Sequence, residues 1–254
     1  MLDSAPSHPY LSDHRFACFA HRGGGAEGPE NAKRTFVAAV ELGFRYIETD
    51  VQATSDGVVM VFHDDALDAL TDAEGVVAEL PYSEVRQARI GSAEPLMTLE
   101  EALSEFPETR FNIDIKTEQT LRPTLDLVRR MNCLDRVCLA SFSDKRLAVI
   151  RRELGQEACT GAGPWGVTAL KFSSWGVPFL RTPAHCAQVP LSEYGITIVT
   201  RRFIRYCERR GVVVHVWTID DEDEIRRLIR LGVHGLMSDR PSLLKRIAIE
   251  EGVW

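Results

Sequence analysis

One short stretch of the chain reads Tyr46-Ile47-Glu48-Thr49-Asp50-Val51-Gln52. Its β-branched and aromatic residues predict a β-strand. Side chains alternate between the two faces of a strand, so Glu48 and Asp50 share one face and lie less than about 7 Å apart. Two carboxylates on a mostly buried face repel each other and lose hydration, so a positive charge is expected between them. A hard divalent cation such as Mg²⁺ or Ca²⁺ suits oxygen ligands of this kind. Salt bridges to Lys or Arg side chains on neighbouring strands are the alternative.

The next extended run, Val58 to His63, follows this strand very closely. Only residues 53–57 separate the two runs. A parallel crossover needs about a dozen residues or more, so the two runs must form an antiparallel hairpin that turns at Ser55-Asp56-Gly57. The second arm is therefore predicted to be an excursion from the main sheet.

Extended and helical segments alternate along the rest of the chain. The segment 34–42 has helical spacing and stops at Gly43, and Thr98-Leu99-Glu100-Glu101 has the capping-box pattern that begins a helix. Without the hairpin arm the predicted strands number eight, and 254 residues is a typical length for a (β/α)₈ barrel. We therefore predict an α/β fold, a TIM barrel formed by one domain over residues 1–254, with a small insertion at 64–97 after the second barrel strand. The predicted strands cover 16–20, 46–52, 110–116, 136–142, 157–163, 184–189, 212–219 and 235–238, and further helices are predicted near 82–88, 122–131, 144–154, 200–210, 222–231 and from 241 onward.

Composition limits the classes of function. The net charge of −7 argues against nucleic-acid binding and against a broadly basic membrane-binding face. No apolar run reaches the roughly 18 residues that a membrane span needs, and Met1 to Arg15 lacks the pattern of a secretory signal. Six scattered cysteines fit buried free thiols better than disulfides or a zinc site. We expect a cytoplasmic protein without stable membrane insertion.

In such a barrel the functional site lies at the carboxyl ends of the strands. Polar residues gather at these predicted ends, and three carboxylates with an arginine and a lysine suit an anion such as phosphate. Two histidines suit the transfer of one proton in and another out. The residues expected there are His21, Arg22, Glu48, Asp50, His63, Asp114 and Lys116.

Several of these residues also have a purely structural interpretation. His63 considered alone is more typical of a core histidine, and Asp114 and Lys116 can form an internal ion pair. His215 is interpreted as structural, whereas Trp217 is interpreted as an aromatic wall for a substrate's carbon chain. The aromatic residues of the Gly- and Pro-containing segment 164–183 either cover a helix or form an exposed apolar lip able to hold an acyl chain. They are Trp165, Phe172, Trp175 and Phe179.

Eight short motifs occur in the order found in one enzyme family. Together they resemble the glycerophosphodiester phosphodiesterase family, over about residues 16 to 248. The motifs are His21-Arg22-Gly23, Pro29-Glu30-Asn31, Glu48-Thr49-Asp50-Val51, His63-Asp64, Thr98-Leu99-Glu100-Glu101, Asn112-Ile113-Asp114-Ile115-Lys116, Val216-Trp217-Thr218 and the closing segment 235–241.

This resemblance implies a TIM barrel, one divalent cation, and hydrolysis of a glycerol-linked phosphodiester to glycerol 3-phosphate and an alcohol. It does not decide between Mg²⁺ and Ca²⁺, nor which histidine is the acid. By position, Glu48, Asp50 and Asp114 correspond to the metal ligands, His21 and His63 to the acid–base pair, Arg22 and Lys116 to the phosphate contacts, and Glu30 to a further polar site residue.

The sequence departs from the family pattern at three places. Asp114 stands where Glu is usual, and the shorter side chain is expected to shift the metal or to insert a water. Ala32 stands where Thr is usual, and Asp68-Ala69-Leu70-Thr71 where a basic residue with two threonines is usual. These differences bear on substrate specificity.

Three other functions are compatible with parts of the pattern. A related enzyme of the lysophospholipase D type would use the aromatic segment to bind a lysolipid. A Schiff-base aldolase would use Lys116 as its nucleophile but would give no role to Glu48 and Asp50. A non-catalytic phosphodiester-binding protein would not require both histidines. The oligomeric state stays open.

Overall fold

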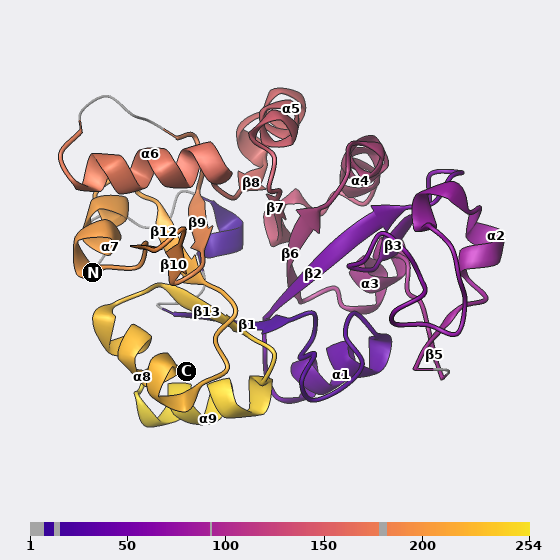
Figure 1. The fold of residues 1–254 in the computed structure, drawn as a ribbon, viewed down its shortest axis with the longest axis horizontal. Coiled ribbons are helices and arrows are strands. Elements are labelled where there is room, and N and C mark those ends of the chain that lie inside the picture. Colours follow the sequence, from indigo (N-terminus) through magenta and orange to yellow (C-terminus); the bar gives the residue numbers. More distant parts are fainter. Residues whose placement is uncertain (1–7, 13–15, 92, 178–181) are drawn as a thin grey trace.

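Eight parallel strands form the centre of the molecule, and the helices lie around them (Figure 1). The computed structural model describes residues 8–12, 16–91, 93–177 and 182–254. The strand order is β8-β7-β6-β2-β1-β13-β12-β9. The two ends of this order meet through a parallel bridge between Gly161 and Cys186, with Ala162 N donating to Cys186 O at 2.8 Å. The TIM-barrel prediction is therefore confirmed. The barrel strands are β1 Ala17–His21, β2 Tyr46–Ala53, β6 Arg110–Ile115, β7 Val137–Ala140, β8 Cys159–Thr160, β9 Cys186–Val189, β12 Val213–Val216 and β13 Gly235–Ser238.

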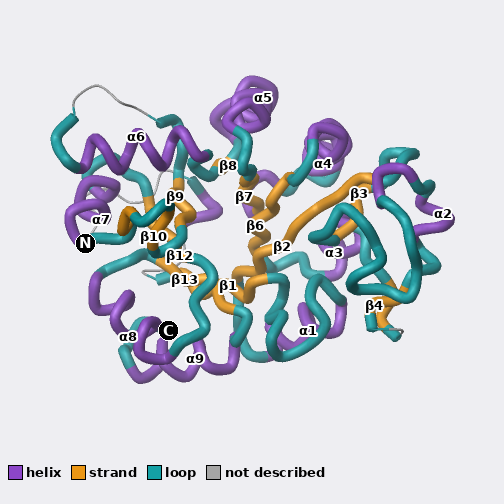
Figure 2. Tube along the Cα trace, viewed as in Figure 1, coloured by secondary structure: helices purple, strands orange, loops and turns teal. Residues whose placement is uncertain are grey.

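Helices follow the barrel strands, as the tube view makes clear (Figure 2). Two of these helices begin and end at the predicted residues, 144–154 and 222–231. The larger helices are α1 Lys33–Glu41, α3 Leu99–Glu105, α4 Glu118–Arg130, α5 Asp144–Leu154, α6 Pro164–Ser174, α7 Arg201–Glu208, α8 Glu222–Leu231 and α9 Pro241–Glu250.

The hairpin predicted from the short connection is present. β3 (Val59–Val61) pairs antiparallel with β2, with Val51 opposite Val61. The residues that follow, up to α3, contain short elements that pack around a small apolar cluster including Met60, Phe62 and Leu67. Figure 1 shows this segment beside β3, away from the barrel axis. Its elements are η2 Val77–Glu79, α2 Tyr82–Val85, β4 Arg89–Ile90 and β5 Glu94–Pro95.

Side-chain caps fix where two helices begin. At α3 the predicted capping box is confirmed, because Thr98 Oγ1 accepts from Glu101 N at 3.1 Å and Glu101 accepts from Thr98 N at 2.8 Å. α4 begins at Glu118 rather than at 122, because Thr117 Oγ1 accepts from Thr120 N and so caps an earlier turn. Pro123 lies inside this helix.

The segment after β8 forms an element that the sequence did not reveal. None of the predicted helices covers this segment. Pro164 occupies the first turn of α6, where a missing N–H has no cost. Trp165, Phe172 and Trp175 are 61%, 41% and 46% exposed, so these aromatic side chains do not serve only to cover a helix. Phe179 lies outside the described residues. A two-stranded hairpin, β10 (Ser192–Glu193) with β11 (Ile196–Thr197), follows β9.

Side chains fill the interior of the barrel away from its carboxyl end. Tyr10, in the short η1 helix (Pro9–Leu11), packs there with Phe19 and Tyr46. His215 is buried beside Phe19, with ring centroids 4.8 Å apart, and burial lowers its pKa to about 4. Its predicted structural role agrees with this position. All six cysteines are buried and unpaired, as predicted.

Within the described ranges, no helix combines the length and the apolar character that a bilayer crossing requires.

Candidate active site

A pocket of about 360 Å³ opens among the residues at the carboxyl ends of the barrel strands. Most of the residues predicted for the site line it. Glu30 does not, although it contacts a residue that does. The predicted residues in the pocket wall are His21, Arg22, Glu48, Asp50, His63, Asp114, Lys116 and Trp217.

Strand register brings the acidic residues together. β2 pairs in parallel with β6, which places Asp50 beside Asp114 and Glu48 beside Asn112. β1 lies on the other side of β2 and places His21 beside Glu48. Because Glu48 and Asp50 are two residues apart, both side chains point into the pocket, as the period of the strand requires.

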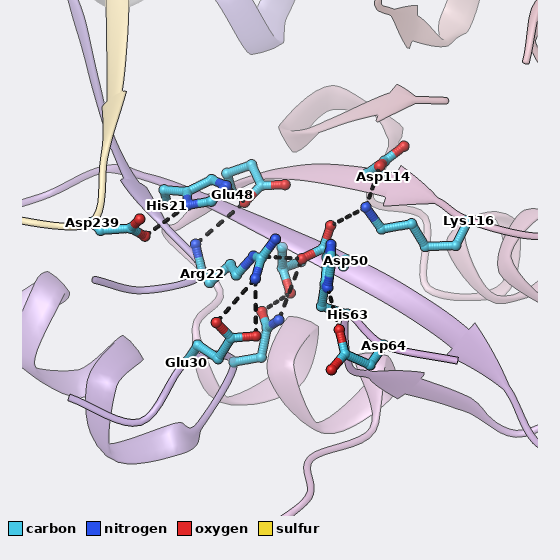
Figure 3. A network of polar contacts seen from close by, with 12 residues as sticks. His21, Arg22, Glu30, Glu48, Asp50, His63, Asp64, Asp114, Lys116 and Asp239 are labelled. Atoms are coloured by element: carbon cyan, nitrogen blue, oxygen red, sulfur yellow. Dashed lines mark hydrogen bonds and ion pairs between the residues drawn. The ribbon is translucent and has the colours of Figure 1, made fainter. Parts of the chain in front are cut away.

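The positive charge expected between the carboxylates comes from Lys116 and Arg22. Lys116 Nζ lies 2.8 Å from Asp50 Oδ1 and 2.8 Å from Asp114 Oδ2, and Arg22 Nε lies 3.1 Å from Asp50 Oδ2 (Figure 3). Burial by itself would raise the pKa of Asp50, but Lys116 and Arg22 outweigh it and lower that pKa. The salt-bridge alternative for this face of β2 is thus present in the structure.

The other two carboxylates are less well neutralised. Burial, followed by the proximity of Asp50, raises the pKa of Glu48 to about 8. Burial also raises the pKa of Asp114 despite the contact with Lys116. Within the described ranges, the buried Oδ1 atom of Asp114 has no hydrogen-bond partner. This oxygen-rich donor set can therefore accept further positive charge.

The side chains as they stand do not form a closed metal site. In the part of the chain that the structure describes, no three His, Cys, Asp or Glu side chains are arranged to hold a metal ion together. The amine of Lys116 lies between two of the three predicted ligands, Asp50 and Asp114. The residues fit a divalent cation by their chemistry and by the unpaired Asp114 oxygen, provided that this amine moves.

A tight turn after β1 brings Arg22 into the pocket. Arg22 has a positive φ of 51° and Gly23 one of 81°, and a Cβ on Gly23 would lie 2.6 Å from the ring of Phe36. Only glycine fits such a close approach at a positive φ. The turn lets Arg22 N donate to Glu48 at 3.3 Å, and both oxygens of Glu30 accept from Arg22 Nη1 at 3.0 Å. Glu30 therefore positions the guanidinium.

Each predicted catalytic histidine is held by a carboxylate through Nδ1. His21 Nδ1 lies 2.7 Å from Asp239 Oδ1, and His63 Nδ1 lies 2.6 Å from Asp64 Oδ1 (Figure 3). Each contact leaves Nε2 for the pocket, and His21 Nε2 is 3.6 Å from Glu48 Oε2. Burial would lower the pKa of His21, but Glu48 and Asp239 outweigh it and raise that pKa.

Known proteins share this fold and sequence pattern. Residues 21–243 match the model of the Glycerophosphoryl diester phosphodiesterase family. The chain belongs to this family. It is 34% identical to the "Probable glycerophosphodiester phosphodiesterase 2" of Mycobacterium tuberculosis, over 98% of this chain and 97% of the relative. The human "Lysophospholipase D GDPD1" is 23% identical, over 96% of this chain and 88% of its own.

A solved structure also supports the fold. The structure of an Oleispira antarctica phosphodiesterase in complex with its product sn-glycerol-3-phosphate superposes with a TM-score of 0.77 at 22% identity, over 92% of this chain and 96% of that one. Together with the family match, these similarities identify the chain as an enzyme, a phosphoric diester hydrolase that acts on glycerophosphodiesters.

Asp239 contacts His21 in this family member, and no role in the site was predicted for it. It lies 218 positions after His21 in the sequence. Its position directly after β13 is the available signal, because the carboxyl ends of all the barrel strands meet around one site.

Asp239→Asn should loosen His21 and lower its pKa. We expect kcat to fall by about 10²-fold, the effect of a small misplacement of a catalytic group. The limb of the pH–rate profile that reports His21 should move to lower pH, because the carboxylate that favours the imidazolium is gone. Steady-state kinetics between pH 5 and 9 measures both effects. An unchanged limb would show that Asp239 does not act on His21.

One half of the pocket wall is apolar. Phe142 follows β7, Pro164 begins α6, and Trp217 follows β12, and all three line the pocket. The rings of Phe142 and Trp217 meet edge to face, with centroids 5.8 Å apart, and Phe142 is 64% exposed. The charged half comes from β1, β2, β3 and β6 and their following residues, so charged and apolar chemistry enter the pocket from opposite parts of the barrel.

Proposed function

We propose that this protein hydrolyses glycerophosphodiesters to glycerol 3-phosphate and an alcohol with the help of one divalent cation and a histidine pair. The observation that carries the proposal is the convergence of two carboxylate-held histidines with three acids in one pocket. Arg22 and Lys116 line the same pocket and supply positive charge for a phosphate.

The acidic and the basic side chains of the pocket have different roles in this proposal. Glu48, Asp50 and Asp114 would hold Mg²⁺ or Ca²⁺, which when bound supplies positive charge beside the phosphoryl oxygens. Arg22 and Lys116 donate hydrogen bonds to those oxygens and stabilise the charge that builds on them. Trp217 contacts the carbon skeleton of the substrate.

The histidines move the protons. One takes a proton from the nucleophile at Nε2, and the other gives a proton from Nε2 to the oxygen of the leaving alcohol. Asp239 and Asp64 orient the two rings through Nδ1, and Asp239 also favours the protonated form of His21. The nucleophile is water or a neighbouring hydroxyl of the substrate, which would give a cyclic phosphate.

A chelation experiment tests the cation. Exhaustive treatment with a chelator should lower glycerol 3-phosphate release from glycerophosphocholine by about 10²-fold or more, and added Mg²⁺ or Ca²⁺ should restore it. Full activity after chelation would remove the cation from the proposal and leave the histidine pair. The same assay over a panel of glycerophosphodiesters would identify the preferred headgroup.

The apolar half of the pocket favours a second substrate class, lysophospholipids. Phe142, Pro164 and Trp217 lie on the pocket wall, and Trp165, which follows Pro164 in the chain, is exposed. These side chains would offer an acyl chain an apolar path outward. The human relative named as a lysophospholipase D is consistent with this candidate.

Removing the exposed aromatic rings distinguishes the two substrate classes. Trp165→Ala and Phe142→Ala should each lower kcat/KM for lysophosphatidylcholine by about tenfold, the value of one buried apolar side chain, with a smaller effect on glycerophosphocholine. Ile249→Ala, which changes an exposed residue on α9, is the matched control. Equal losses for both substrates would exclude acyl-chain binding on this wall.

The structure argues against the aldolase alternative. A Schiff-base lysine must be neutral to attack, whereas Asp114 and Asp50 outweigh burial and raise the pKa of Lys116. We also propose a cytoplasmic location, which the six buried, unpaired thiols support.

A further inference from the structure

The amine of Lys116 occupies the space between two neighbouring carboxylates. Asp50 and Asp114 face each other across the β2–β6 pair, and Lys116 Nζ is 2.8 Å from each. The two aspartate side chains are 3% and 8% exposed, so little water is present to separate their charges. Figure 3 shows the amine between them.

The oxygens of Asp50 are already engaged. Oδ1 pairs with Lys116, while Oδ2 lies 3.1 Å from Arg22 Nε and 3.4 Å from Asn31 Nδ2. On Asp114, Oδ2 pairs with Lys116 and Oδ1 is the buried oxygen without a hydrogen bond among the described residues. A divalent cation binds carboxylate oxygens at about 2.0–2.6 Å. The ammonium group in the gap therefore competes with a cation for the oxygens of both aspartates.

We propose that Lys116 is a displaceable counter-ion: it neutralises Asp50 and Asp114 in the cation-free protein and swings into the pocket when a cation binds. This inference rests on the proposed function, which places a cation on these acids. The flexible four-carbon stem of a lysine permits the movement. The exposed Phe142 ring, whose centroid is already 5.9 Å from Nζ, gives the amine an aromatic face to move toward.

This exchange couples the cation to the phosphate. The cation must first break two ion pairs, which weakens its binding, but the released amine then becomes free to pair with a phosphate oxygen. Each ligand therefore assists the other, and by linkage the factor is the same in both directions. Lys116 thus prepares the phosphate site only after the cation site is filled.

Calorimetric titration with Mg²⁺ and inorganic phosphate tests the proposal without turnover. The proteins are the wild type, Lys116→Met, and the control Lys145→Met, which changes an exposed lysine on α5. Lys116→Met should bind Mg²⁺ about tenfold more tightly than the wild type, a difference of about 1.4 kcal/mol. The control should match the wild type.

The coupling factor separates displacement from a simple loss of repulsion. Saturating Mg²⁺ should tighten phosphate binding by a larger factor in the wild type than in Lys116→Met, because only the wild type has an amine to release. An equal factor in both proteins, or unchanged Mg²⁺ affinity in the variant, would overturn the proposal.

If Lys116→Met does not fold, a crystal structure of the wild type with bound Mg²⁺ tests whether the cation displaces Lys116. With Mg²⁺ bound, Lys116 Nζ must lie beyond hydrogen-bond distance of Asp50 or Asp114. Retention of both 2.8 Å contacts beside a bound cation, in an enzyme that still hydrolyses its substrate, would overturn this inference alone. Failure of the wild type to bind Mg²⁺ or Ca²⁺ at all would overturn the proposed cation site as well.

Discussion

His21→Ala and His63→Ala are each expected to lower kcat/KM by about 10²–10⁴-fold while the protein stays folded. Each variant removes one of the two groups that exchange protons with the nucleophile and the leaving alcohol. The orienting residues Asp239 and Asp64 stay in place but cannot supply the missing Nε2. Both histidines lie at the pocket wall and are partly exposed, so truncation leaves no buried cavity in the core.

The measurement combines steady-state hydrolysis of glycerophosphocholine with thermal melting. His185→Asn is the matched control, because His185 precedes β9 and so lies at the opposite end of the barrel. It should keep wild-type kinetics. Near-normal activity in either active-site variant would remove that histidine from the mechanism. If a variant shows no folded-state melting transition, its loss of activity is explained by unfolding.

Glu48→Gln should abolish cation-dependent activity and yet stabilise the cation-free protein. The folded-state pKa of Glu48 is about 8, against an ordinary value of 4.5. As the pH rises from 4.5 to 8, the unfolded chain releases the proton of Glu48 while the folded chain retains it. The folded state therefore loses stability across this window, and the loss is complete above pH 8. A glutamine of the same shape does not ionise, so the variant escapes the loss.

Thermal melting in the presence of a chelator measures this effect. The melting temperature of Glu48→Gln should exceed that of the wild type, and the difference should grow between pH 5 and pH 8. Activity with saturating Mg²⁺ or Ca²⁺ should fall by about 10²-fold or more, because one ligand has lost its charge. A variant less stable than the wild type at pH 8 would contradict the assigned ionisation of Glu48.

Local sequence patterns predicted the parts of this site that depend on short-range geometry. Glu48 and Asp50 share a face because strands have a period of two, and the brief connection after Gln52 requires a hairpin that returns His63 to the same end. The capping box at Thr98 is equally local.

Features that depend on distant contacts were not evident from the sequence. Asp239 reaches His21 only because the last strand of the chain pairs with the first. The place of Lys116 between two aspartates depends on the β2–β6 register, which the sequence of either strand alone does not contain. None of the predicted helices covers α6, in which Pro164 is the first residue and Gly166 is buried.

The barrel strands differ in how many residues they pair with their neighbours, and the acids and the apolar wall lie on differently paired parts of the barrel. The ladder between β2 and β6 runs from Tyr46 to Val51 and carries the acids, whereas β8 spans only Cys159–Thr160 and meets β9 through an isolated bridge. The loops that follow β8 and β9 supply much of the apolar wall. Mutations in these loops would therefore change which alcohol is accepted, while the acids stay on the two strands with the longest pairing.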